Sequence, residues 1–228
     1  MLQKSNSPLD GIVVDFLNQI LFAGPPILIA LTFHEYSHAY MANRLGDPTA
    51  RMMGRLTLNP LKHLDPFGTL LLFIANFGWA KPVPVDPSYF KNPPRDMLMV
   101  ALAGPVSNVM LAAVFGVLYR LVDASLLQLP AGSGFFITML RYAIFINLVL
   151  AFFNLIPIPP LDGSKILRGL LSPEAAARYA QFENYGPFVL IGLIIFSRLA
   201  GVSIFWKIIG PLVDLFGWIL AGIRFGYG

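Results

Sequence analysis

Five consecutive residues, His34-Glu35-Tyr36-Ser37-His38, hold two of the chain's three histidines and a glutamate. On a helix, residues i and i+4 lie on one face about one turn apart, so both imidazoles can reach a single metal ion at about 2.0–2.1 Å. The glutamate beside the first histidine can then serve as general base toward a water on the metal. This H-E-x-x-H pattern is typical of zinc-dependent hydrolases, but five residues are too short a pattern to decide the function alone.

The surroundings of the motif strengthen this interpretation. It follows the uncharged apolar run Ile27–Phe33 without a break. Ionisable groups inside an apolar helix are energetically costly and mark functional sites. In the alternative, His34 and His38 hydrogen-bond to neighbours across a helix interface and no metal is needed. We favour the metal site because three ionisable groups share one helical turn.

A catalytic zinc usually has three protein ligands and one open position, so a third ligand is needed at the depth of the motif. Residues of suitable type within or beside the apolar segments are Asp15, His63, Asp65, Asp162 and Asp214. Asp162 follows the proline-rich stretch Pro157–Pro160 and precedes Gly163, which presents its carboxylate on irregular backbone. An Asp-Gly pair is equally common in a turn that caps a helix, here one starting near Ser164. These residues alone leave both roles open.

His63 lies in a polar loop bounded by prolines. A fourth protein ligand would displace the water that hydrolysis needs. We therefore expect His63 to be an accessory residue with a structural or gating role, hydrogen-bonded to Asp65 or to backbone, rather than a metal ligand.

The composition places these residues in a membrane protein. Of 228 residues, 56% are hydrophobic and only 12% are charged, about half the charged share of a soluble domain. The absence of cysteine excludes disulfides, iron–sulfur clusters and cysteine-ligated zinc. In so apolar a chain, the net charge of +4 indicates cytoplasmic loops rather than a nucleic-acid partner.

Uncharged runs of about 20 residues are long enough to cross a bilayer as helices. The apolar runs with few charges that meet or approach this length, or form two C-terminal helices, are 27–45, 97–121, 135–154, 187–200 and 203–223. Residues 11–23 are amphipathic, and Gly24-Pro25-Pro26 leaves open whether 11–44 is one kinked helix or two. We predict an all-α polytopic membrane protein with about five or six transmembrane helices.

Two motifs together resemble the site-2 protease family of intramembrane zinc metalloproteases. They are H-E-x-x-H at 34–38 and N-x-x-P-x-x-x-L-D-G at 154–163, and similar patches occur at 54–66, 78–85 and 103–108. The resemblance covers about residues 24–170 and is closest to a compact bacterial type without a PDZ or CBS domain. It implies a single membrane-embedded metalloprotease domain over 1–228, with the catalytic core at about 24–170 and C-terminal helices at about 187–223.

The resemblance also implies roles for individual residues. His34, His38 and Asp162 would hold one Zn²⁺ per chain, and Glu35 would be the general base for a zinc-activated water. Asn108 and Asn154 match positions that line the site, where their amides could contact substrate backbone or an oxyanion.

The implied activity is hydrolysis of peptide bonds in membrane proteins or membrane-anchored peptides, within or near the lipid bilayer. The expected location is the bacterial inner membrane, with the active site toward the cytoplasmic side; the oligomeric state is open. The alternative is a catalytically silent metal-binding scaffold or a transporter. A transporter needs polar residues along a full path, and the runs 97–119 and 135–153 contain almost none.

The charges and the metal site together predict the topology. Lys and Arg cluster in 45–95 and 160–185 and are absent from 122–134, so the first two segments should be cytoplasmic. For Asp162 to meet His34 and His38, the chain must cross the membrane an even number of times between them. The short apolar stretch 66–79 should therefore be a re-entrant or hairpin-like segment that does not cross.

Overall fold

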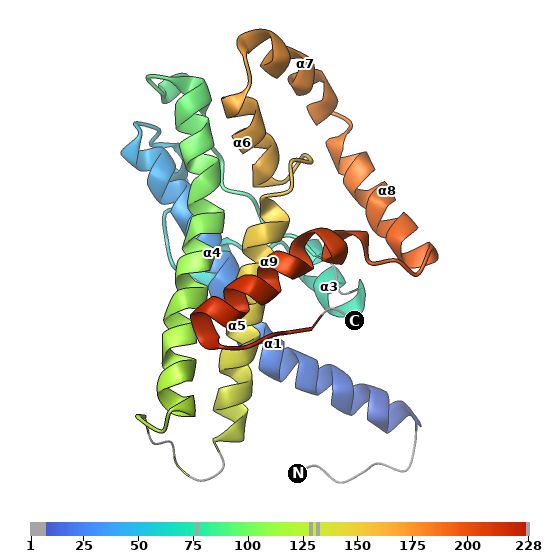
Figure 1. Ribbon diagram of the computed structural model, residues 1–228. Coiled ribbons are helices and arrows are strands. Elements are labelled where there is room, and N and C mark those ends of the chain that lie inside the picture. Colours follow the sequence, from blue (N-terminus) through green and yellow to red (C-terminus); the bar gives the residue numbers. More distant parts are fainter. Residues whose placement is uncertain (1–7, 76–77, 128–129, 131–132, 227–228) are drawn as a thin grey trace.

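A computed structural model describes residues 8–75, 78–127, 130 and 133–226, and the side chains of these except 8–19 and 72–75 (Figure 1). Its described residues form helices and no strand, which confirms the all-α class. The helices are α1 (Pro8–Arg44), α2 (Thr49–Met52), α3 (Pro66–Ala75), α4 (Pro93–Asp123), α5 (Gly134–Asn154), α6 (Asp162–Leu170), α7 (Pro173–Glu183), α8 (Gly186–Leu199) and α9 (Ile204–Ala221). Two 3₁₀ turns, η1 (Pro60–Lys62) and η2 (Pro87–Tyr89), lie in the connections.

Helices α1, α4 and α5 pack against one another and form the bundle that carries the site. Helix α4 starts with prolines at its first two positions, where no backbone donor is lost, and Asn92 caps it. The packed core lies between α4, α5 and α9, where Ile144, Leu148 and Val213 are fully buried. Apolar side chains at helical spacing thus hold α5 in the middle of the bundle.

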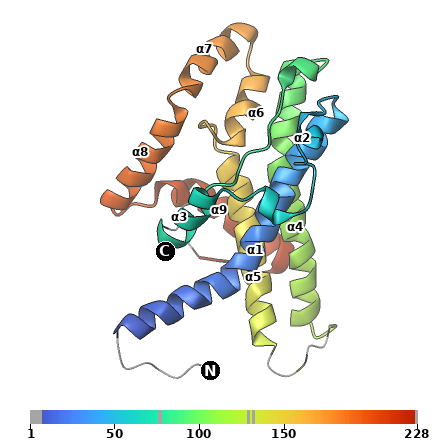
Figure 2. The same cartoon turned by 180° about the vertical axis from the view of Figure 1, so that it is seen from behind.

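Three helices in the described part of the chain, α4, α5 and α9, are long and apolar enough to cross a membrane, and α8 is a shorter apolar helix. The sequence left open whether residues 11–44 form one kinked helix or two. They belong to the single helix α1. Figure 2 shows α1 changing direction along its length, and Pro25 and Pro26 lie inside it. These helices make the chain a polytopic membrane protein.

The described parts of the stretch 66–79 fold back on themselves, which agrees with the hairpin-like segment predicted for it. Leu64 pairs with Ala80 in an antiparallel bridge, and the Lys81 N–H donates to the His63 carbonyl at 2.8 Å. Between them α3 packs directly on the returning chain, because a methyl group on Gly68 would lie 2.2 Å from the Trp79 carbonyl oxygen. Since residues 64 and 80 are neighbours, the segment returns to the side of the bundle that it left.

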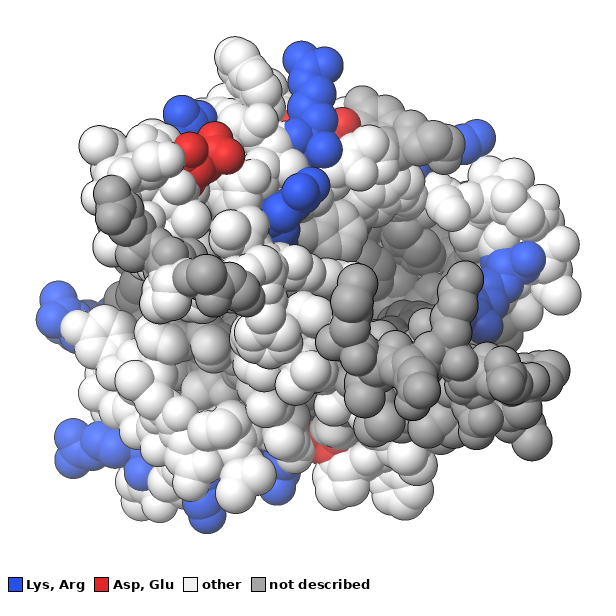
Figure 3. Space-filling model, turned by 90° about the horizontal axis from the view of Figure 1, so that it is seen from below, with Lys and Arg blue, Asp and Glu red and all other residues white. Residues whose placement is uncertain are grey.

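The charged segments gather at one end of the bundle. Helices α2, α6 and α7 and the start of α4 lie together there, opposite the α4–α5 connection (Figures 1 and 2). These helices belong to the segments 45–95 and 160–185, which were predicted to share a side, whereas α3, also within 45–95, lies nearer the middle of the bundle. Viewed from the opposite end, most of the described surface is uncharged, and several Lys and Arg side chains but few acidic ones are visible, mainly toward its edge (Figure 3).

Candidate metal centre

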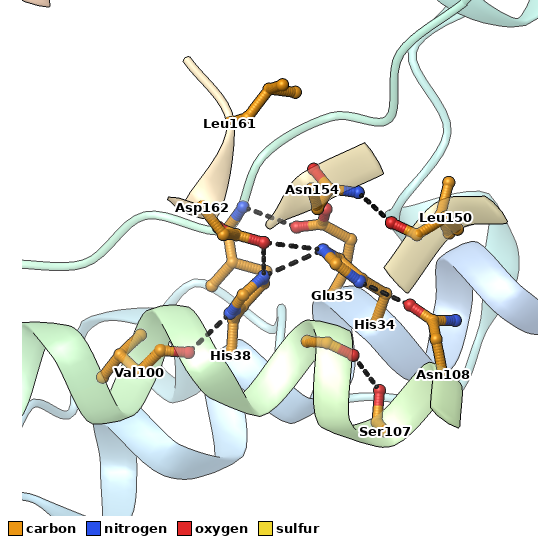
Figure 4. Close-up of polar contacts among 12 residues, drawn as sticks. His34, Glu35, His38, Val100, Ser107, Asn108, Leu150, Asn154, Leu161 and Asp162 are labelled. Atoms are coloured by element: carbon orange, nitrogen blue, oxygen red, sulfur yellow. Dashed lines mark hydrogen bonds and ion pairs between the residues drawn. The ribbon is translucent and has the colours of Figure 1, made fainter. Parts of the chain in front are cut away.

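Helix α1 and the start of α6 bring three donor atoms together (Figure 4). The Nε2 atoms of His34 and His38 lie 3.0 Å apart. Oδ2 of Asp162 lies 3.1 Å from the first and 3.2 Å from the second. All three side chains are buried. In a zinc tetrahedron with bonds of about 2.0–2.1 Å, neighbouring ligand atoms are about 3.3 Å apart, so this triangle has the size of one tetrahedral face.

The groups behind the imidazoles decide which nitrogen carries the proton. Nδ1 of His34 lies 2.7 Å from Oδ1 of Asn108, and Nδ1 of His38 lies 2.8 Å from the Val100 carbonyl. Both partners are acceptors, so each Nδ1 donates, and in the neutral imidazoles each Nε2 then presents a lone pair. Two lone pairs and a carboxylate then face one another in a buried space. A divalent cation satisfies this donor set, and two imidazoles with one carboxylate suit zinc.

Helix α4 approaches the histidines closely because Gly104 has no side chain. A methyl group there would lie 2.5 Å from Nε2 of His38 and 2.6 Å from Cε1 of His34. Gly163 has the same role on the other side of the site, since a methyl group would lie 2.3 Å from the Leu155 carbonyl oxygen. Two glycines thus let α4 and α6 close around the donor atoms.

The structure distinguishes between the two roles left open for Asp162. Leu161 occupies the cap position of α6 and Asp162 is its first residue. The Asp162 carboxylate is directed at the two imidazoles, so its position fits the candidate metal site rather than a helix cap. Pro157–Pro160 end the preceding helix and allow α6 to start beside α1.

The other acidic candidates and His63 have different partners. Asp65 accepts the Gly68 N–H at the start of α3, and Asp214 accepts the Phe225 and Gly226 N–H groups. His63 is 1% exposed at the base of the hairpin, and its Nε2 lies 2.8 Å from the Thr57 carbonyl. This position fits the structural role expected for it. The side chain of Asp15 lies outside the described residues.

Glu35 faces an extended segment that follows the hairpin. Its Oε2 accepts the Val83 N–H at 3.0 Å (Figure 4). Arg55 donates to the carbonyls of Lys81 and Pro82 on the same segment, at 2.7 and 3.2 Å. Burial lowers the pKa of Arg55, whereas the nearby Glu35 carboxylate raises it. A cation and the candidate base thus hold residues 81–83 between them.

A cavity of about 380 Å³ opens beside these groups. Its walls include His34, Glu35, His38 and Asp162, together with Asn154. Nδ2 of Asn154 donates to the Leu150 carbonyl at 2.9 Å. The cavity is large enough for an extended peptide segment to reach the donor atoms.

Asn108 differs from its expected position. It is fully buried behind His34, and its Nδ2 donates to the Ala30 carbonyl at 3.1 Å and to Oδ1 of Asn147 at 2.9 Å. With both amide hydrogens in use and its oxygen on His34, it has no group left for substrate. The expected substrate or oxyanion contact of Asn108 is therefore corrected to a hydrogen bond that orients His34.

The sequence analysis missed two residues that the structure brings to the site. Asn147 is the fully buried partner of Asn108, and an amide in the middle of a largely apolar helix was the signal for it. Arg55 is 6% exposed, and its place in the basic segment 45–95 and in the family-like patch 54–66 gave it no role of its own.

Comparisons with known proteins find relatives whose names describe them as zinc metalloproteases. Residues 124–197 match the sequence profile described as Peptidase family M50. YwhC of Bacillus subtilis, a candidate zinc metalloprotease by its name, is 43% identical over 184 residues, covering 80% of this chain and 83% of YwhC. Rip2 of Mycobacterium tuberculosis H37Rv, named in the same way, is 34% identical over 83% of this chain and 72% of Rip2. No solved structure matches significantly.

Proposed function

Because the chain belongs to peptidase family M50, the site-2 protease family of zinc metalloproteases, we propose that it hydrolyses peptide bonds of membrane-spanning or membrane-anchored substrates within or near the bilayer. One observation supports this most directly. Two Nε2 lone pairs and a carboxylate oxygen, all buried and 3.0–3.2 Å apart, lie beside a glutamate in a cavity.

His34, His38 and Asp162 are the residues that would hold one zinc ion per chain. When bound, zinc lowers the pKa of a coordinated water to about 7 and polarises the scissile carbonyl. Asn108 and the Val100 carbonyl keep both imidazoles in the tautomer that such binding requires. The imidazoles thus already have the orientation that zinc binding requires before substrate binds.

Glu35 is the proposed general base. It takes the proton of the attacking water and returns it to the leaving amine. Its Oε2 is held by the Val83 N–H, so the carboxylate has a defined orientation. Asn154, on the cavity wall, has a second amide hydrogen that could contact a substrate carbonyl or oxyanion.

The substrate has to be extended at the scissile bond, because a helix buries its carbonyls in internal hydrogen bonds. We place the protein in a bacterial inner membrane, with the end that carries α2, α6 and α7 toward the cytoplasm. The basic residues of this end support that orientation.

A substitution of the base tests the activity. Glu35→Gln should retain zinc but abolish cleavage, since the amide cannot accept the proton. Membrane fragments that accumulate with the wild type and are absent with Glu35→Gln would identify substrates by proteomics. Cleavage near the wild-type rate in Glu35→Gln would remove Glu35 as base, and identical fragment profiles would favour a catalytically silent scaffold.

A second substitution tests the third ligand. Asp162→Ala should lower the zinc content of the purified protein, because two imidazoles alone leave the site incomplete. Metal analysis measures this directly, with Asp65→Ala, whose carboxylate caps α3, as the matched control. Full zinc occupancy in Asp162→Ala would exclude Asp162 from the metal site.

A further inference from the structure

One peptide group, between Pro82 and Val83, contacts both Arg55 and Glu35. Its carbonyl accepts from a guanidinium nitrogen of Arg55 at 3.2 Å. Its N–H donates to Oε2 of Glu35 at 3.0 Å. The buried Arg55 cation, this peptide group and the buried Glu35 carboxylate therefore lie in series. Arg55 donates to the peptide, and the peptide donates to Glu35.

The local fold holds Arg55 in this position. Gly54 has a left-handed φ of 66°, which turns the chain after α2, and the Arg55 N–H donates to the Ala50 carbonyl at 2.8 Å. The guanidinium also donates to the Lys81 carbonyl at 2.7 Å, so its planar fork spans two successive carbonyls. The side chain is 6% exposed.

A second buried contact joins the same two segments. Asp47, which is fully buried, accepts the Thr49 N–H at 2.9 Å and the Asp86 N–H at 2.8 Å. The segment 81–86 is thus fastened at both ends to the chain that follows α1. The peptide before Val83 has little freedom to move away from Glu35.

We propose that Arg55 is a positioning residue for the general base, and this rests on the function proposed for Glu35. A charged donor on a carbonyl polarises the peptide and strengthens its N–H as a donor. Arg55 thereby fixes the Pro82–Val83 peptide, and the peptide fixes one oxygen of Glu35. The other carboxylate oxygen of Glu35, Oε1, is then the one that accepts the proton of the attacking water. If Arg55 only stabilised the loop, it would hold residues 81–83 in place without affecting the orientation of Glu35.

Nuclear magnetic resonance can observe this peptide directly. With ¹³C-carbonyl proline and ¹⁵N valine, each Pro-Val pair gives one cross-peak, and the chain contains the pairs Pro82–Val83, Pro84–Val85 and Pro105–Val106. The first peak reports the carbonyl that Arg55 contacts and the N–H that Glu35 contacts. The other two are internal references in the same full-length, zinc-loaded protein in detergent micelles.

Two substitutions should move this peak from opposite ends. Glu35→Gln should shift the Val83 proton upfield, because a neutral amide is a weaker acceptor than a carboxylate. Arg55→Gln should shift both the Pro82 carbonyl carbon and the Val83 proton, and Arg55→Lys should shift them less. Arg51→Gln, at an exposed arginine four residues earlier, should leave the peak in place.

Rescue separates positioning from simple loss of structure. Methylguanidinium added to Arg55→Ala should return the Val83 proton toward its wild-type position. A Val83 proton that does not respond to Arg55→Gln, or that responds to it but not to Glu35→Gln, would overturn the proposal. Zinc content and fragment proteomics test the protease function separately, so a failure of that function would not be mistaken for a failure of this coupling.

Discussion

At the candidate metal centre, each imidazole is oriented by the acceptor behind its Nδ1 atom. Asn108 accepts from Nδ1 of His34 and the Val100 carbonyl accepts from Nδ1 of His38. The Asn108 amide is itself held by Ala30 and Asn147, so its oxygen faces the imidazole. The orientation of His34, a candidate zinc ligand, therefore depends on two asparagines in largely apolar helices.

The close contact between Gly104 of α4 and the two histidines leads to a prediction for a single added methyl group. Gly104→Ala places a methyl group 2.5 Å from Nε2 of His38, so both imidazoles must move. Displaced ligands should weaken zinc binding by roughly 10- to 100-fold, as the loss of an outer-shell contact does. Competition with a chromophoric chelator measures the affinity.

The matched control for this substitution is Gly192→Ala in α8, where an added methyl group meets nothing within 4 Å. It should leave zinc affinity unchanged. Wild-type affinity in Gly104→Ala would show that the imidazoles have room to spare, contrary to the packing described above.

Among the elements, the hairpin that contains α3 has the largest consequence for the site. Its two ends pair at Leu64 and Ala80, and the returning chain runs directly into the segment that contacts Glu35. If this stretch crossed the membrane, Asp162 would emerge on the side opposite the histidines. A short apolar segment that turns back is thus what allows α1 and α6 to meet.

The hairpin can be tested with cysteines, because the chain has none. A Leu64→Cys/Ala80→Cys double variant should form a disulfide under mild oxidation, since these residues are bridge partners. Thiol titration and a reduction-sensitive gel shift after cleavage within the hairpin would detect it. The pair Leu61→Cys/Ala80→Cys is the control, and equal cross-linking of both pairs would contradict the register.

For the whole molecule, the distribution of charge matches the arrangement of the bundle. Helices α2, α6 and α7, which carry Arg51, Lys165, Arg168 and Arg178, lie at one end, and the adjoining ends of α4 and α5 lie at the other (Figure 1). Long apolar helices between these ends leave the site buried in the bundle rather than on its surface. The scarcity of charge is therefore a property of the surface that faces lipid.

Single cysteines also test the orientation. Leu126→Cys, in the α4–α5 connection, should react with a membrane-impermeant thiol reagent in intact cells. Leu170→Cys, at the end of α6, should react only after permeabilisation, because the positive charges keep that end in the cytoplasm. Both side chains are largely exposed, at 76% and 72%, so accessibility is decided by the membrane. The reverse labelling pattern would invert the proposed topology.

The sequence by itself determined the type of chemistry, the helical membrane class and the need for a segment that does not cross. The first two follow from local spacing and from the length of apolar runs, which act within one segment at a time. The third follows from counting crossings between the two motifs that the family resemblance brings together. The expected ranges 97–121 and 135–154 differ from α4 and α5 by only a few residues at their ends.

Only the tertiary structure decided which distant atoms meet at the site. Asn108 and Asp162 are 74 and 128 residues from His34 along the chain, and no local pattern states that both contact its imidazole. From the residues alone the role of Asp162 was open, because an Asp-Gly pair is the same in a helix cap and at a metal site; only the family resemblance implied that it is a metal ligand. Arg55 was missed because its function depends on a peptide 26–27 residues away that reaches it only when the hairpin closes.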